Sequence, residues 1–295
     1  MIIVTLIAAG KLSRDDIYRA SDLLGDANIS ANDWSWVEEG SAADIECRAA
    51  PLQIYAIRAA LAELQGIDTI VQAAADRTKK LLVADMDSTM IGQECIDELA
   101  DFAGIKPQVA AITEQAMRGE LDFAAALRER VALLKGLDQT MIGRCLAERV
   151  RANPGARTLV RTMRVRGATT LLVSGGFTAF AEPVAEMLGF EQVRANWLGH
   201  SGGFLTGQTE GPVIDAEAKR FALEEVRSDL GISSAEVLAI GDGANDRAMI
   251  QAAGLGVAYR AKSALAEIAD ARLDYNDLDA LLWAQGIART QWVID

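Results

Sequence analysis

The segment LLVADMDSTM, residues 81–90, runs from a continuous apolar stretch directly into two aspartates, Asp85 and Asp87. Short apolar runs of this kind are typical of strands that are buried on both faces of a sheet. Alternate residues of an extended chain project to the same side, so both carboxylates can face one site. Two anions placed this close repel each other and need a cation or a proton between them. The alternative is that Asp87 or Ser88 only caps a following helix.

Three later segments contain a similar short apolar run: TTLLVSGG at 169–176, VLAIGDG at 237–243 and GLGVAY at 254–259. Helical stretches separate them, which predicts an α/β fold with a Rossmann-like parallel sheet covered by helices. In such sheets, ligands bind outside the carboxyl ends of the strands. The helical insertion at about residues 90–150 is too long for a simple crossover connection, so we expect it to form a cap.

The first 76 residues have a different pattern from the rest of the chain. Strand-like and helix-like segments alternate in the order βαββαβ, and Ser13 is a candidate N-cap of the first helix. This order predicts a small α+β domain with an antiparallel sheet and two helices on one face. The basic segment DRTKK at 76–80 follows it. We therefore expect one domain at 1–76 and a second at 77–295.

The composition is that of an acidic chain of 295 residues, with a formal net charge of −13. This charge disfavours nucleic-acid binding, and no apolar run approaches the roughly 18 residues of a membrane span. The three cysteines (Cys47, Cys95 and Cys145) form no CxxC pair, which favours a reducing, cytoplasmic setting without disulfides or a zinc site. The one histidine, His200, makes a Ser-His-Asp hydrolase improbable.

Three further motifs carry candidate chemistry. AIGDGAND places Asp242 at a predicted strand end, and such carboxylates suit Mg²⁺, which prefers oxygen ligands. Ser174, Gly175 and the glycine that follows end another strand, where a hydroxyl and open N–H groups can hold phosphate oxygens. Lys219 lies in a predicted helix. Taken alone, Ser-Gly-Gly is also a common turn, and a single lysine is usually a solvated helix residue.

In this order the motifs resemble those of the haloacid dehalogenase superfamily, over about residues 80–280. The resemblance implies that Asp85 attacks phosphorus as a nucleophile and forms an aspartyl-phosphate. Asp87 would act first as a general acid and then as a general base. This division agrees with the chemistry of phosphoryl transfer, which needs a protonated leaving group and then an activated water.

The same resemblance implies a set of binding residues around the phosphoryl group. Ser174, Lys219 and the N–H groups at Gly175 would hold its oxygens, with Asn245 close by. The Mg²⁺ site is expected to consist of Asp85, Asp87 and Asp242, and Asp246 is expected to support it.

The predicted cap resembles that of the phosphoserine phosphatase family in IGQECIDELADFAG and ITEQAMRGELDFAAALRERVALLKGL. This resemblance implies that Glu94 binds the ammonium group of O-phospho-L-serine and that Arg130 binds its carboxylate. Met117 and Phe123 match residues that line and close the pocket. The implied reaction is hydrolysis to L-serine and phosphate, the last step of serine biosynthesis. Without the resemblance, Glu94 and Arg130 would be better explained as ordinary surface charges on amphipathic helices.

Several alternatives stay open on the sequence alone. The chemistry is compatible with another small phosphomonoester such as phosphohomoserine, or with phosphate transfer to an alcohol. A non-catalytic amino-acid sensor is a more distant alternative. The first 76 residues look like ACT-type modules, which bind amino acids, but they show no clear ligand-binding glycine turn. They could instead form a homodimer.

Overall fold

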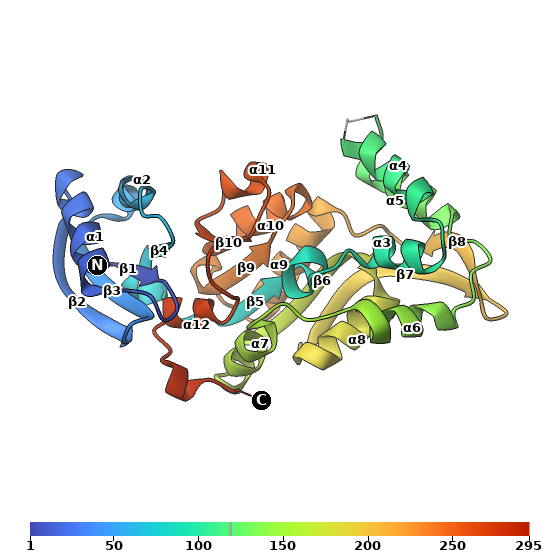
Figure 1. Ribbon diagram of the computed structural model, residues 1–295. Coiled ribbons are helices and arrows are strands. Elements are labelled where there is room, and N and C mark those ends of the chain that lie inside the picture. The colour runs from blue at the N-terminus through green and yellow to red at the C-terminus, as the bar shows by residue number, and fades with distance from the viewer. Residues whose placement is uncertain (118–119, 295) are drawn as a thin grey trace.

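The computed structural model describes residues 1–117 and 120–294, apart from the side chains of Pro51, Ala116 and Met117. Two sheets organise the described chain, one of four strands near the N-terminus and one of seven strands in the remainder (Figure 1). Among the described residues, no helix is both long enough and apolar enough to cross a membrane.

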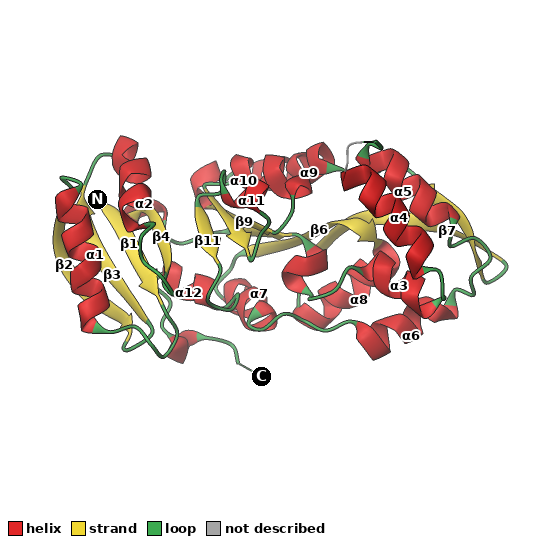
Figure 2. Cartoon of the chain, turned by 45° about the horizontal axis from the view of Figure 1, so that its top comes forward, coloured by secondary structure: helices red, strands yellow, loops and turns green. Residues whose placement is uncertain are grey.

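The N-terminal sheet is antiparallel, with the strand order β2-β3-β1-β4. Alternate residues of β1 share a core with Ile17 of α1 and Ile57 of α2, so both helices cover the same face (Figure 2). Ser13 caps α1 in a capping box with Asp16, as the sequence predicts. The predicted βαββαβ order is confirmed. Its elements are β1 (Ile2–Ile7), α1 (Arg14–Asp26), β2 (Ser30–Glu38), β3 (Ala42–Arg48), α2 (Ile54–Leu61) and β4 (Asp68–Ala73).

The larger sheet has the strand order β11-β10-β9-β5-β6-β7-β8. All neighbouring strands are parallel except β7 and β8, which form an antiparallel hairpin at one edge. The four continuous apolar runs of the sequence are β5, β6, β9 and β10, so the predicted parallel sheet is confirmed. The strands are β5 (Leu81–Ala84), β6 (Thr169–Phe177), β7 (Gln192–Ser201), β8 (Phe204–Glu210), β9 (Val237–Gly241), β10 (Leu255–Tyr259) and β11 (Ala271–Leu273).

Helices cover both faces of this sheet, which explains its continuous apolar strands. In β5, Leu81 and Val83 pack into a core with α9 and α10, whereas Leu82 packs into a second core with α7, α8 and α12. The covering helices are α7 (Ala156–Val165), α8 (Thr178–Leu188), α9 (Ala216–Asp229), α10 (Arg247–Ala252), α11 (Ser263–Ala266) and α12 (Ala280–Ala284).

The predicted helical insertion lies between β5 and β6. It contains α3 (Cys95–Phe102), α4 (Lys106–Met117), α5 (Phe123–Ala132) and α6 (Thr140–Arg149). Helices α4 and α5 stand out from the large sheet at the end remote from the N-terminal sheet (Figure 1), and α5 packs against β8. The cap surface therefore combines the insertion with the later hairpin.

Buried polar contacts join the two sheets. The carboxylate of Asp68 in β4 accepts hydrogen bonds from the backbone N–H groups of Asp274, Tyr275 and Asn276. Arg77 pairs with Asp44 of β3 and also donates to the carbonyl of Ala284 in α12. These contacts link strands of the first sheet to segments more than two hundred residues later.

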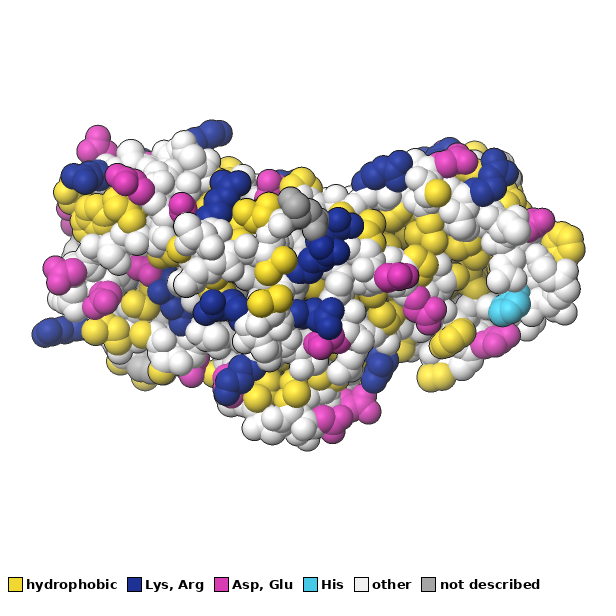
Figure 3. Space-filling view, turned by 90° about the horizontal axis from the view of Figure 1, so that it is seen from below, with side chains coloured by type: hydrophobic (Ala, Val, Ile, Leu, Met, Phe, Trp, Pro, Cys, Tyr) yellow, Lys and Arg dark blue, Asp and Glu magenta, His cyan; other side chains and the backbone are white. Residues whose placement is uncertain are grey.

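The surface mixes charges of both signs. On the face that Figure 3 presents, basic side chains lie in small groups separated by acidic and apolar ones. Such mixing weakens the local field and gives a polyanion no continuous basic surface on this face.

Candidate active site

The acidic pair of the opening motif leaves β5 in one wide turn. Asp85 donates its backbone N–H to the carbonyl of Ile240 (3.0 Å), which continues the ladder between β5 and β9 by one residue. Residues Met86–Met90 then form a turn that the N–H of Ile91 closes on the carbonyl of Met86 (3.1 Å). Ser88 adopts φ of 54° within it, a left-handed conformation that costs energy for a residue with a side chain. The turn holds Asp85 and Asp87 at the edge of the sheet.

Lys219 of α9 lies between two of the carboxylates. Its Nζ atom is 2.7 Å from Oδ1 of Asp85 and 2.7 Å from Oδ1 of Asp246. All three side chains are almost fully buried, with exposed fractions of 1%, 5% and 0% for Lys219, Asp85 and Asp246. The buried ammonium thus compensates two buried anions at once.

The pKa values of this buried group follow from burial and from charge. Burial raises the pKa of Asp85 well above its usual range, and the charge of Asp246 adds to this effect, while Lys219 opposes it. Burial acts to lower the pKa of Lys219, but the carboxylates of Asp246 and Asp85 outweigh it and leave that pKa raised. Lys219 therefore stays a cation at neutral pH, and its charge favours the ionised form of Asp85.

Three carboxylates form a group that suits a divalent cation. Asp85, Asp242 and Asp246 each bring an oxygen atom to within 4.8 Å of the others. Asp246 already uses Oδ1 for Lys219 and Oδ2 for the N–H groups of Asp242 and Gly243. Asp85 and Asp242 each keep an oxygen without a hydrogen-bond donor among the described residues. These two free oxygens fit the oxygen preference of Mg²⁺.

Asp242 follows β9, and Thr89 donates to its Oδ1 (3.2 Å). Burial raises the pKa of Asp242 to about 6, and the charges of Asp246 and Glu94 add to it. A cation at this position would favour the ionised carboxylate.

Asp87 points away from the three clustered carboxylates. Its Oδ1 accepts the backbone N–H of Cys95 (3.1 Å), and a Cβ atom on Gly176 would lie 2.9 Å from its Oδ2. The pKa of Asp87 is raised to about 7, mainly by burial and next by the charge of Glu94. A carboxyl with such a pKa can both give and take a proton near neutral pH.

The end of β6 supplies a hydroxyl and N–H groups beside these carboxylates. Ser174 is buried, and its Oγ accepts the N–H of Gly176 (2.8 Å). Asn196 fixes the turn by donating to the carbonyl of Gly175 (2.8 Å). A Cβ atom on Gly175 would lie 2.9 Å from Cζ of Phe123, so this cap residue lies against the turn.

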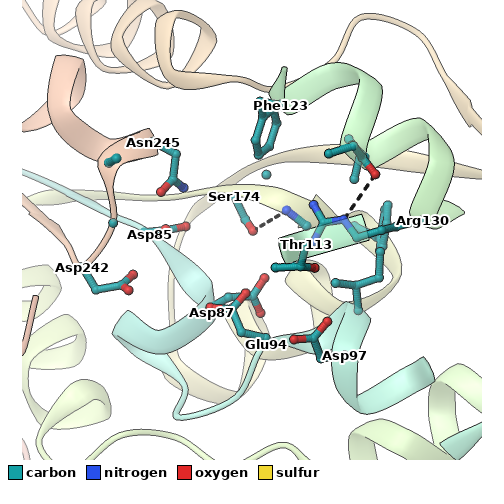
Figure 4. A pocket seen from close by; sticks show the side chains of 18 of the residues that line it. Asp85, Asp87, Glu94, Asp97, Thr113, Phe123, Arg130, Ser174, Asp242 and Asn245 are labelled. Atoms are coloured by element: carbon teal, nitrogen blue, oxygen red, sulfur yellow. Dashed lines mark hydrogen bonds between the residues drawn. The ribbon is translucent and has the colours of Figure 1, made fainter. Parts of the chain in front are cut away.

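A cleft of about 560 Å³ lies between these strand ends and the cap helices. Its lining includes Asp85 and Ser174 from the sheet together with Glu94 and Arg130 from the insertion (Figure 4). One oxygen of Glu94 accepts the hydroxyl of Ser88 (2.7 Å). Burial lowers the pKa of Arg130, whose Nε donates to the carbonyl of Ala126 (3.3 Å). The cleft therefore has acidic and basic side chains from the cap above a carboxylate floor.

The structure brings most of the predicted site residues to this cleft. Those that line it are Asp85, Asp87, Glu94, Phe123, Arg130, Ser174, Gly175, Asp242 and Asn245. Lys219 and Asp246 lie beneath it and contact Asp85 and the backbone of Asp242. Met117 ends α4, and its side chain lies outside the described part of the chain.

Four further polar residues at the site were not predicted from the sequence. Asp97, Thr113 and Lys262 line the cleft, and Thr89 holds Asp242. The spacing of Glu94 and Asp97 was the available signal, because residues three apart lie on one face of a helix. Lys262 carried no such signal, since it lies beyond β10 and reaches the cleft only through the fold.

Comparison with known proteins identifies relatives for most of the chain. The family model of haloacid dehalogenase-like hydrolases matches residues 82–251. Phosphoserine phosphatase SerB2 of Mycobacterium tuberculosis is 46% identical over 239 residues, which are 81% of this chain and 58% of that protein. The chain thus spans less than two thirds of the mycobacterial relative. Phosphoserine phosphatase of Albidiferax ferrireducens is 47% identical over 208 residues, 69% of this chain and 88% of that protein.

Solved structures that resemble this chain also include phosphoserine phosphatases. A probable phosphoserine phosphatase from Vibrio cholerae has a TM-score of 0.77 and 28% identity, and the match covers 98% of this chain and 88% of that one. The phospho-aspartyl intermediate analogue of a phosphoserine phosphatase has a TM-score of 0.65 and 39% identity, over 70% of this chain and 98% of the other. The match to the Vibrio cholerae structure covers nearly the whole chain and therefore includes the N-terminal sheet.

Proposed function

Since the chain belongs to the haloacid dehalogenase-like hydrolases, we propose that it is a Mg²⁺-dependent phosphoserine phosphatase with Asp85 as its nucleophile. The observation that carries the proposal is the position of Asp85. Its carboxylate is paired with Lys219 at the floor of a cleft whose other walls carry Glu94 and Arg130. A phosphate ester of an amino acid needs this combination of a nucleophile, a cation and one partner of each sign.

In the first step, an oxygen of Asp85 attacks phosphorus while the ester P–O bond breaks. Lys219 pairs with Asp85 and the backbone at Gly175 lines the cleft, so both can stabilise charge on the phosphoryl oxygens. Ser174 adds a hydroxyl on the same side. The products of this step are an aspartyl-phosphate and the alkoxide of serine.

Asp87 then controls the protons. In its protonated form it gives its proton to the serine alkoxide, which leaves as L-serine. The resulting carboxylate takes a proton from the water that attacks the phosphorus of the aspartyl-phosphate. Phosphate is released, and the carboxylate of Asp85 and the protonated form of Asp87 are restored. A pKa of about 7 suits both halves of this cycle.

The metal is proposed to be held by Asp85 and Asp242, the two carboxylates with free oxygens, and Asp246 orients this pair through Lys219 and the backbone of Asp242. When bound, Mg²⁺ would neutralise charge on the phosphate. The carboxylate of Asp87 faces Gly176 and Cys95 and not the carboxylates of Asp85 and Asp242. We therefore propose that Asp87 belongs to the metal site through its position in the turn and not through its carboxylate.

The cap is proposed to recognise the amino-acid part of the substrate. Arg130 offers a planar pair of donors to the carboxylate, and Glu94 offers an anion to the ammonium group. Phe123 closes the cleft over Gly175, which excludes water from the phosphate. Asn245 also lines the cleft.

The test is phosphate release from a panel of phosphorylated amino acids and sugars, with and without Mg²⁺. We expect O-phospho-L-serine to be hydrolysed best, only with the metal, and the Asp85→Asn variant to remain folded without turnover. Preference for a sugar phosphate would refute the substrate. Substantial turnover by Asp85→Asn would refute the nucleophile. Phosphohomoserine belongs in the panel because one methylene changes binding by only about 1–3 kcal/mol.

Two wider proposals concern the rest of the protein. We propose that residues 1–76 form a separate domain that either binds an amino acid or forms a homodimer, because this segment has its own apolar core. We also propose a cytoplasmic location, which the three free, buried cysteines support. Calorimetry with L-serine and sedimentation of the full chain distinguish ligand binding from dimer formation.

A further inference from the structure

One buried carboxylate oxygen in the cleft lacks a hydrogen-bond donor within the described part of the chain. Asp97 lies in the first turn of α3, three residues after Glu94, and lines the cleft together with Arg130 (Figure 4). Its Oδ1 atom is buried, and no donor among the described residues reaches it. A buried carboxylate oxygen without a hydrogen bond is costly and uncommon, so it calls for a ligand.

Arg130 is a possible partner for Asp97 in the cleft, but its Nε atom is engaged elsewhere. Among the described residues, no ion pair joins Asp97 to Arg130, whose Nε instead donates to the carbonyl of Ala126. The charge of Asp97 nevertheless raises the pKa of Arg130 more than the charge of Glu94 or Asp87 does. Both side chains line the cleft, so the space between them is open to a ligand (Figure 4).

Glu94 alone does not satisfy an ammonium group. The ammonium has three N–H donors. One oxygen of Glu94 already accepts the hydroxyl of Ser88 (2.7 Å), which leaves the other oxygen for the substrate. A second acceptor beside Glu94 would complete the recognition of the cation.

We propose that Asp97 is this second acceptor and that it determines specificity for phosphate esters that carry an ammonium group. The proposal rests on the proposed function and extends it by one residue. Substrate binding would place the ammonium between the carboxylates of Glu94 and Asp97, with the substrate carboxylate on Arg130. The bound zwitterion would thus lie between the side chains of Asp97 and Arg130.

Four substrates separate the two ends of the amino acid. O-phosphoserine has both the ammonium and the carboxylate, O-phosphoethanolamine only the ammonium, 3-phosphoglycerate only the carboxylate, and phenyl phosphate neither. We expect Asp97→Asn to lower kcat/KM about 10- to 100-fold on the two ammonium substrates, because a charge-assisted hydrogen bond is lost. On 3-phosphoglycerate and phenyl phosphate we expect a change of less than about 2-fold.

The matched control is Asp101→Asn, one turn later on α3. Asp101 pairs with Arg149 outside the cleft and should leave the ranking of the four substrates unchanged. Thermal unfolding of both variants shows whether each is folded under the assay conditions.

Two results would overturn the role of Asp97. An equal loss of kcat/KM on 3-phosphoglycerate would mean that Asp97 acts by positioning Arg130 or the cap. No loss on any substrate would mean that it has no role in recognition. Failure of the proposed function gives a different result, since wild-type protein would then show no preference for O-phosphoserine over phenyl phosphate. Without that preference, the role of Asp97 fails as well.

Discussion

The Nζ atom of Lys219 lies 2.7 Å from Oδ1 of Asp85, and both side chains are almost completely buried. Lys219 comes from α9 and Asp85 from the end of β5, so the contact joins a covering helix to the central strand of the sheet. The same ammonium contacts Asp246, and its removal would leave two buried anions without a cation.

Lys219→Met should reduce both stability and turnover. Removing one partner of a buried ion pair costs about 3–5 kcal/mol, because the remaining charge is desolvated. The loss in the free energy of unfolding, measured with urea in metal-free buffer at pH 7, should shrink at lower pH, where Asp85, whose pKa is raised, takes up a proton.

Lys80→Met is the matched control. Lys80 pairs with Glu236 at 2.6 Å, but its side chain is 61% exposed, and such pairs contribute at most about 1 kcal/mol. Equal losses for the two variants would contradict the importance of the buried pair.

Gly176→Ala should lower kcat without unfolding the protein. A Cβ atom there would lie 2.9 Å from Oδ2 of Asp87 and 3.0 Å from Oγ of Ser174. Small displacements of catalytic groups cost about 10- to 100-fold in rate. Initial rates at saturating O-phosphoserine test this, with Gly143→Ala as a control, because a Cβ on Gly143 in α6 meets no atom within 4 Å. Unchanged kcat in Gly176→Ala would show that Asp87 tolerates the displacement.

The sequence predicted the part of the site that depends on strands. Continuous apolar runs identify buried parallel strands, and the ends of such strands meet at one edge, so Asp85, Ser174 and Asp242 could be placed together. The contact between Lys219 and Asp246 could not be predicted. It spans 27 residues and depends on the orientation of α9, which no local pattern determines.

The junction between the sheets was equally inaccessible to sequence analysis. Asp68 lies within a predicted strand, DTIVQA, where an aspartate would ordinarily be assigned to the solvent face. Its partners begin 206 residues later. Oδ1 of Asp97, which has no donor among the described residues, is likewise a property of the assembled cleft, whose lining combines residues of α3, α4 and α5 with the strand ends.

The stability of the metal-free protein should fall as the pH rises from about 4 to 7. The pKa values of Asp242 and Asp87 are raised to about 6 and about 7, above the usual value of about 3.9 for an unfolded chain. Over this interval the folded state holds more protons than the unfolded state, so raising the pH favours unfolding. Each carboxyl contributes at most about 1.4 kcal/mol per pH unit.

Urea unfolding at a series of pH values in EDTA measures this dependence. Asp242→Asn removes one of the two groups and should flatten the curve between about pH 4 and 6. Added Mg²⁺ should stabilise the wild type most above pH 6, where Asp242 is ionised. Parallel curves for wild type and Asp242→Asn would contradict the raised pKa of Asp242.

Asp68→Ala should weaken the attachment of the N-terminal sheet. The carboxylate of Asp68 is 3% exposed and accepts the backbone N–H groups of Asp274, Tyr275 and Asn276 as well as the Nδ2 group of Asn276 (2.8 Å). Alanine would leave these donors, of which the two of Asn276 are buried, without an acceptor. This costs about 1–3 kcal/mol for each donor that water does not reach. We expect a loss of about 2–4 kcal/mol in the free energy of unfolding.

Hydrogen exchange locates the effect of this substitution. The amides of residues 274–276 should exchange faster in Asp68→Ala, and those of β5 and β9 in the other sheet should change less, because their ladders do not involve Asp68. Asp33→Ala, an exposed position in β2 of the same sheet, should alter stability by less than about 0.5 kcal/mol. If exchange at 274–276 stays slow in Asp68→Ala, other contacts such as Arg77 with Ala284 hold the two sheets together.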